Sequence, residues 1–117
     1  MTSVRRIIVS VSDLQRSLAV YSGSLRLPVV WANDEVARLD AGGVELMLHQ
    51  RRPTPGEFGV TASFAVEDVD TTTADAVAAG CSIVRGPGDE PWGERQSVLH
   101  DPDGHVVCVV GPAAKTP

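Results

Sequence analysis

The feature that most constrains the fold of this chain is a short internal repeat. The tetrapeptides at 11–14 (VSDL) and 66–69 (VEDV) match at a spacing of 55 residues. Each follows an apolar, β-branched run and precedes apolar residues at helical spacing, so each marks a junction between a strand and a helix. The repeat therefore predicts two copies of one structural module, one after the other along the chain.

The first half of the chain predicts the element order β-α-β-β-β. Strands are predicted at 4–11, 29–32, 35–40 and 44–50. Ser12 is predicted to begin the helix as its N-cap, with Gln15 in the capping-box position. The apolar face of this helix is predicted from residues three or four apart, namely Leu14, Leu18, Tyr21 and Leu25.

The second half predicts the same order. Strands are predicted at 60–66, 81–84, 95–100 and 105–110, with a Gly/Pro loop at 86–93 and a tight DPDG turn at 101–104. The helix between the first two strands is predicted to end at Gly80, with one buried face made of Val69, Thr73, Ala76 and Val77. One domain of two modules is expected, at about 4–50 and 60–112, with a linker at 51–59 and a frayed end at 113–117.

Alternation along the strands predicts two unlike faces for each sheet. One face is uniformly apolar and suits packing under a helix: Ile7, Val9, Val11, Leu46, Leu48, Val60, Ala62, Phe64, Val66, Val107 and Val109. The other face is mixed: Arg6, Ile8, Ser10, Glu45, Met47, His49, Thr61, Ser63, Ala65, Val106, Cys108 and Val110. The pattern predicts an α+β protein whose two modules form an open, cup-shaped curved sheet around the mixed faces, with the helices outside.

Composition excludes several classes of protein. The net charge of −5 and the absence of a basic tract argue against binding of nucleic acid. No apolar run approaches the roughly 20 residues of a membrane helix, and the N-terminus is too short and polar for a signal peptide, which predicts a cytoplasmic protein. Cys81 and Cys108 are predicted to be buried free thiols, since their number and spacing fit neither a disulfide framework nor a zinc motif.

The segment 91–110 (PWGERQSVLHDPDGHVVCVV) carries a family resemblance. It resembles the last hairpin of the glyoxalase/bleomycin-resistance/dioxygenase superfamily, also called the vicinal oxygen chelate superfamily. The Pro-Trp-Gly-x-Arg variant, with its basic residue at Arg95, is most similar to the bleomycin-resistance branch. The resemblance covers nearly the whole chain and implies the same two-module cup, completed between two chains of a homodimer, which is also the commonest kind of oligomer.

Metal-dependent members of that superfamily carry four ligands, and the resemblance places the equivalent positions at Arg6, Glu45, Thr61 and Cys108. Guanidinium has no lone pair to offer and Thr is a poor ligand, so only Glu45 keeps a ligand type of the metal enzymes. We therefore expect no metal and no other cofactor. We expect Arg6 to lie where the ion would be and to pair with Glu45; the alternative is that Arg6 extends to the strand end and pairs elsewhere.

The predicted ligand-binding residues are those that the mixed face and the mobile loops bring to a cup: Trp31, Arg6, Glu45, Met47, His49, Ser63, Trp92 and Cys108. Several have plainer interpretations. His49 also fits a strand-end residue near solvent, Trp92 a plug over the sheet edge, and Cys108 a packed, inert thiol. Arg38 and Arg95 could flank the mouth of the cup, or be solvated. The loops at 51–59 and 86–93 could gate it.

The first functional hypothesis is a metal-free binding protein without catalytic residues. It would sequester a small natural product, such as an antibiotic, in cups at a homodimer interface. The alternative is a lyase or isomerase of the same superfamily that uses Glu45 or His49, with or without a divalent metal. A third hypothesis is an accessory domain that acts through a protein partner. Fold alone does not choose among them.

Overall fold

The chain forms two βαβββ modules in a computed structural model that describes residues 4–56 and 60–113. Its internal contacts divide it into two units, of which the first ends at Thr54 and the second begins at Pro55. We call these units module one and module two. Residues 57–59 of the expected linker and residues 114–117 of the expected frayed end lie outside the described residues.

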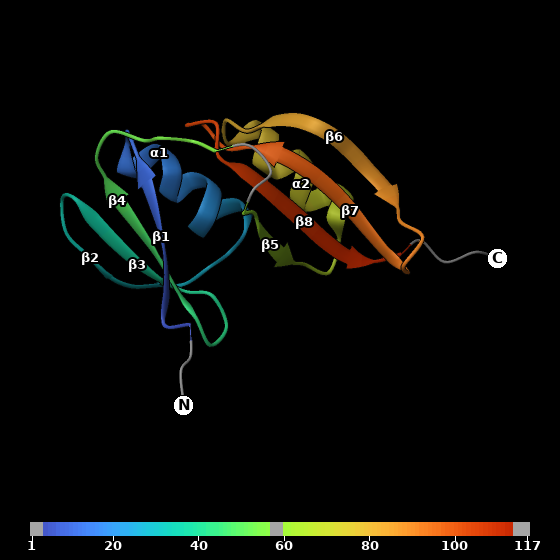
Figure 1. The fold of residues 1–117 in the computed structure, drawn as a ribbon, viewed down its shortest axis with the longest axis horizontal. Coiled ribbons are helices and arrows are strands. Elements are labelled where there is room, and N and C mark those ends of the chain that lie inside the picture. The colour runs from blue at the N-terminus through green and yellow to red at the C-terminus, as the bar shows by residue number, and fades with distance from the viewer. Residues whose placement is uncertain (1–3, 57–59, 114–117) are drawn as a thin grey trace. The chain divides into compact units, whose positions relative to one another are not determined.

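Module one contains one mixed sheet and one helical segment (Figure 1). Its elements are β1 (Arg6–Val11), α1 (Leu14–Leu18), the π-helical turn η1 (Ala19–Ser24), β2 (Val29–Ala32), β3 (Val36–Asp40) and β4 (Glu45–Gln50). The strand order is β1-β4-β3-β2. β1 and β4 are parallel, whereas β4, β3 and β2 are joined in antiparallel fashion.

Module two repeats this arrangement (Figure 1). Its elements are β5 (Ala62–Ala65), α2 (Val69–Ala78), β6 (Ser82–Asp89), β7 (Glu94–His100) and β8 (Val106–Pro112). The strand order is β5-β8-β7-β6, with β5 and β8 parallel. The predicted α+β class and the repeated β-α-β-β-β order are therefore confirmed. No helix among the described residues is long and apolar enough to cross a membrane.

Each module buries the predicted apolar face of its sheet. In module one the buried side chains include Val11, Leu14, Val20, Tyr21, Ala37, Leu39, Leu46 and Leu48, and in module two Val69, Ala76, Leu99, Val107 and Val109. The alternation fails toward the beginning of β1 and before β5. Ile7 is 40% exposed, and Val60 is 96% exposed because β5 begins two residues later, so no neighbouring strand or helix covers it.

Each helix has an aspartate as its N-cap, directly before a buried apolar residue. Asp13 is the N-cap of α1, and its Oδ1 accepts from the Arg16 N–H at 3.1 Å, so the prediction of Ser12 was wrong. Asp68 caps α2 in the same way, through the Thr71 N–H. An aspartate at the N-cap accepts hydrogen bonds from the unpaired N–H groups of the first turn, as a serine also can. Its negative charge interacts favourably with the N-terminal end of the helix dipole in addition.

Strand β6 corrects the predicted loop at 86–93. The strand continues to Asp89, and only the turn at 90–93 remains. β6 is an edge strand with two register shifts along β7, which is where a sheet tolerates Pro87 and the flanking glycines. A second correction concerns Val77, which is 41% exposed instead of buried, because α2 turns its Val69, Thr73 and Ala76 side inward.

The DPDG turn between β7 and β8 forms as predicted. Asp101 is 3% exposed, and its Oδ1 accepts from the N–H groups of Asp103 and His105, each at 2.9 Å. Gly104 has φ of +89°, a conformation that L residues with a side chain rarely adopt. The turn sets the register of β7 on β8.

Candidate ligand-binding face

The face of the module-one sheet that is opposite to its helix brings five of the predicted ligand-binding residues together. Strand register aligns one row across all four strands, in the order Trp31, Arg38, Met47 and Ile8. The adjacent registers pair Arg6 with Glu45 and Ser10 with His49. Residues directly opposite on neighbouring strands share a face, so these side chains form one surface, which we call the open face of module one.

Glu45 is held between two arginines on this face. The Nε of Arg6, from β1, donates to Glu45 Oε2, and the Nε of Arg38, from β3, donates to Glu45 Oε1 at 2.6 Å. The predicted pairing of Arg6 with Glu45 is therefore confirmed, and the strand-end alternative for Arg6 is wrong. Arg38 was not predicted to join them. The hairpin at 40–45 contained the signal, since its register places Arg38 opposite Met47 and so on the same face as Glu45.

The two arginines fix the ionisation of Glu45. The hydrogen bond from Arg6 is the main cause that lowers the pKa of this carboxyl; partial burial opposes it, and Arg38 lowers it further. The side chain of Glu45 is 16% exposed. A carboxylate with a lowered pKa and both oxygens occupied is a weak proton acceptor at neutral pH, so the geometry disfavours Glu45 as a general base.

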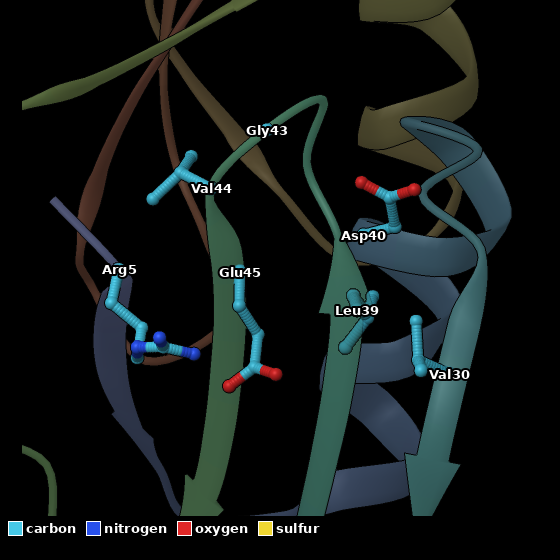
Figure 2. A pocket seen from close by; sticks show the side chains of 7 residues that line it. All are labelled: Arg5, Val30, Leu39, Asp40, Gly43, Val44 and Glu45. Carbon is cyan, nitrogen blue, oxygen red and sulfur yellow. The ribbon is translucent and has the colours of Figure 1, made fainter. Parts of the chain in front are cut away.

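A hollow of about 250 Å³ lies at the hairpin end of this sheet. Figure 2 shows the seven residues that line it, Arg5, Val30, Leu39, Asp40, Gly43, Val44 and Glu45. The Arg5 side chain reaches toward β4, which carries Glu45, whereas the Asp40 carboxylate points upward in the view, away from the Glu45 carboxylate (Figure 2). The hollow therefore shares Glu45 with the open face but does not include Trp31, Met47 or His49.

The equivalent face of module two is less polar. Strand register aligns a row in the order Arg85, Val98, Cys108 and Ser63. Ser63 is exposed and Cys108 is half-buried, so the prediction of two buried thiols holds only for Cys81. Burial raises the pKa of Cys108, although the charge of Arg85 acts in the opposite direction. This supports the interpretation of Cys108 as a protonated, unreactive thiol.

The other conspicuous residues of module two are held by local contacts. Trp92 is 62% exposed in the turn at 90–93, and its Nε1 donates to Glu94 Oε1 at 2.8 Å. Arg95 makes a two-pronged pair with Asp70, through Nε at 2.7 Å and an amino group at 3.0 Å, and a further bond to Asp89. Arg95 therefore ties β7 to the first turn of α2 and to the end of β6, and the alternative of a solvated Arg95 is wrong.

The geometry defines a class of protein, namely a two-module α+β protein with an open, arginine-lined sheet face. A family model described as the glyoxalase/bleomycin resistance protein/dioxygenase superfamily matches residues 3–109, so the chain belongs to this superfamily. The superfamily predicted from the segment at 91–110 is thus confirmed.

Relatives of this chain carry little functional detail. It is 46% identical over 76 residues to CFP32 of Mycobacterium bovis, provisionally named a glyoxylase; the match covers 64% of this chain and only 29% of CFP32. It is 29% identical over 112 residues to an uncharacterized protein of Mycolicibacterium smegmatis, with 93% of each chain covered. A glyoxalase-related enzyme from Fulvimarina pelagi superimposes with a TM-score of 0.82 at 22% identity, over 95% of this chain and 88% of that chain, which shows the fold.

The side chains at the four positions that the resemblance aligns with metal ligands do not fit a metal. The Arg6 guanidinium has no lone pair, and both oxygens of Glu45 accept from arginines. In module two the register places Ser63, not Thr61, opposite Cys108. Within residues 4–56 and 60–113, no three His, Cys, Asp or Glu side chains come together. This donor set offers one carboxylate whose two oxygens are occupied by arginines and one protonated thiol, and neither is a strong ligand in that state.

Proposed function

We propose that this protein is a metal-free binding protein that sequesters a small natural product, such as an antibiotic, in cups at a homodimer interface. The observation that carries the proposal is the Glu45 carboxylate held between Arg6 and Arg38. The resemblance aligns Arg6 and Glu45 with two ligand positions of the superfamily's metal enzymes, and in this chain the two residues form an ion pair instead. The surrounding open face offers Trp31, Met47 and His49 for contact, and binding by such a face requires no catalytic residue.

Ser63, Cys108 and Trp92 would contribute ligand contacts from module two in this proposal. Ser63 and Trp92 are exposed and Cys108 is half-buried.

We further propose that the protein acts in the cytoplasm and binds neither nucleic acid nor membrane, consistent with its net charge of −5. Sedimentation of the purified chain tests the dimer, which should have twice the mass of the 12.3 kDa chain.

A lyase or isomerase is the second candidate, and the names of relatives favour it, since CFP32 carries the name of a glyoxylase. In this candidate His49 would be the base, because the lowered pKa of Glu45 makes that carboxylate a poor one. His49 lies in β4 between Ser10 of β1 and Val36 of β3 and is half-buried.

Tryptophan fluorescence distinguishes the candidates because Trp31 and Trp92 are the only two tryptophans. Metal-stripped protein would be titrated with bleomycin-like, mitomycin-like and intercalating peptide antibiotics. Trp92→Phe leaves Trp31 as the reporter on the open face, and Trp31→Phe is the matched control. The expected result is a saturable change in the Trp92→Phe variant near one ligand per chain, with the ligand recovered intact.

Two outcomes would contradict sequestration. Binding that appears only after a divalent metal is added would mean that the metal ligands lie elsewhere in the chain. Recovery of a chemically altered ligand would make the protein an enzyme, and loss of that turnover in His49→Gln but not in Glu45→Gln would assign the base.

A further inference from the structure

We propose that the cluster of Arg6, Glu45 and Arg38 is an anion subsite, which takes a carboxylate or similar anionic group carried by a planar aromatic ring that stacks on Trp31. The inference rests on the proposed function, in that it assumes that the open face of module one is where the ligand binds. It adds the chemical class of that ligand, which neither the family nor the relatives specify.

The cluster carries an excess positive charge. Two guanidinium groups share one carboxylate, and each donates to it through Nε alone. Within the part of the chain that the structure describes, the terminal amino groups of Arg6 and Arg38 make no hydrogen bond. A guanidinium has five N–H donors in a planar fork that matches a carboxylate, so each arginine keeps an edge for a second anion.

Both arginine side chains are accessible to a ligand. The Arg6 and Arg38 side chains are 31% and 39% exposed, whereas the Glu45 side chain between them is 16% exposed. The carboxylate is therefore the most covered member of the cluster. Because Glu45 fixes their orientation beforehand, a bound anion would not have to order two long, flexible side chains.

Other charged groups near the cluster do not cancel this excess. Asp40 is the register partner of Glu45, but its Oδ1 accepts from the Gly42 N–H at 2.9 Å and its carboxylate points away from Glu45 (Figure 2). On the opposite side Arg5 is exposed and lines the same hollow. With Arg5 and Asp40 counted, three cations face two anions, in a chain whose net charge is −5.

Trp31 supplies the aromatic half of the subsite. It is 48% exposed and lies directly opposite Arg38 on the neighbouring strand. Opposed side chains have Cβ atoms about 5 Å apart, so a ring stacked on Trp31 would bring an acidic substituent within reach of Arg38. An indole face gains from stacking on a flat ring, and a half-exposed indole is available for it.

Calorimetric titration of the 117-residue chain with three probes tests the proposal. The probes are 2-naphthoate, its neutral isostere 2-naphthamide, and cyclohexanecarboxylate, which keeps the charge but lacks the flat ring. We expect naphthoate to bind about tenfold or more tightly than either of the other two, since charge-assisted hydrogen bonds and stacking each contribute. Arg38→Gln should remove the preference for naphthoate over naphthamide.

Matched variants separate the subsite from general effects of charge. Arg52→Gln changes the net charge equally at an exposed position after β4 and should leave the preference intact. Glu45→Gln removes one negative charge while its amide oxygen can still accept from an arginine, so it should tighten naphthoate binding roughly threefold or more. Trp31→Ala should weaken naphthoate and naphthamide alike.

The outcomes distinguish this inference from the function on which it rests. Equal affinity for naphthoate and naphthamide, or equal effects of Arg38→Gln and Arg52→Gln, would overturn the anion subsite. If naphthamide binding still depended on Trp31 in that case, the open face would remain a ligand-binding face. If none of the three probes bound in a manner that depends on Trp31, both the subsite and the binding face would be rejected.

Discussion

The open faces of the two modules differ far more than the faces that the helices cover. Below α1 and α2 both modules bury aliphatic side chains, such as Leu48 and Val109. On the opposite side, the aligned row of module one is Trp31, Arg38, Met47 and Ile8, with the Arg6 and Glu45 pair beside it. The equivalent row of module two is Arg85, Val98, Cys108 and Ser63. The sheet face that packs against a helix requires apolar side chains in both modules. The open face is not under this requirement, so its residues can differ between the modules and can bind a ligand.

The junction between helix and sheet also differs between the modules. In module one the side chain of Gln50, at the end of β4, accepts from the Leu14 N–H of the first helical turn at 2.8 Å. In module two the corresponding position is Gly111, and a Cβ there would lie 2.6 Å from the Val66 carbonyl oxygen. One module ties its helix to the sheet with a side chain; the other lets the backbone approach closely.

The largest expected effect separates the two faces of module one. Leu48→Ala should lower the free energy of unfolding by about 2–5 kcal/mol, because Leu48 is fully buried and the truncation leaves a cavity. Met47→Ala, one residue earlier on the half-buried open face, should cost about 1 kcal/mol or less. Urea unfolding measures both. Equal losses would mean that the open face is a second core.

The next largest effect tests the close approach of the Gly111 backbone to Val66 in module two. Gly111→Ala should destabilise the protein by about 1–3 kcal/mol, since the new methyl group meets backbone at Val66 and the Val69 side chain, and backbone cannot move aside cheaply. Gly88→Ala is the control, because a Cβ at Gly88 meets nothing within 4 Å, and it should change stability by about 0.5 kcal/mol at most. A Gly111→Ala variant as stable as Gly88→Ala would contradict the junction.

A smaller effect concerns one buried hydroxyl in each helix. Thr73 of α2 shares a hydrogen bond of 2.7 Å with Ser97 of β7, and both are buried. Ser17 of α1 is fully buried, and its hydroxyl has no partner among the described residues. Thr73→Val should cost about 1–2 kcal/mol, because it leaves the Ser97 hydroxyl unsatisfied, whereas Ser17→Ala should be neutral or stabilising. Thermal unfolding compares the two variants. A loss on Ser17→Ala would show that this hydroxyl has a partner.

The smallest expected effect is on how the free energy of unfolding falls at acid pH. Arg6 lowers the pKa of Glu45 in module one, and Arg95 lowers that of Asp70 in module two. Because each folded pKa lies below the unfolded value, each pair contributes stability that is complete above the unfolded pKa and is lost as the pH falls through the folded one, roughly from pH 5 to pH 3. Asp70 is 58% exposed against 16% for Glu45, so solvent screens it more.

Glu45→Gln should therefore flatten the pH dependence of the unfolding midpoint between pH 5 and pH 3 more than Asp70→Asn does. Added salt should diminish the contribution of Asp70 before that of Glu45, because exposed pairs are screened first. Equal flattening by the two variants would show that the two pairs are equally exposed to solvent. An unchanged profile in Glu45→Gln would mean that Arg6 and Arg38 do not favour the ionised carboxylate.

The sequence by itself was sufficient for most of what depends on local pattern. The repeated tetrapeptide, the period of two in the strands and the DPDG turn predicted the order of elements and the faces of β4 and β8. The resemblance of the segment at 91–110 indicated the superfamily. The pairing of Arg6 with Glu45 was predictable from the sequence and the family resemblance, since both residues fall on one face of strands that the family places side by side. Local errors arose where two residues compete for one role, as Ser12 and Asp13 do for the N-cap.

Only the tertiary structure decided what depends on register between strands and on which strand lies at an edge. Arg38 joins Glu45 because the hairpin register places it there, and Trp31 joins the same row after an irregularity in β2 that no periodicity predicts. β6 runs through Gly86, Pro87 and Gly88 because an edge strand needs hydrogen bonds on one side alone. Side-chain alternation is set within a strand, whereas pairing is set by the neighbour, and the neighbour is known only when the chain has folded.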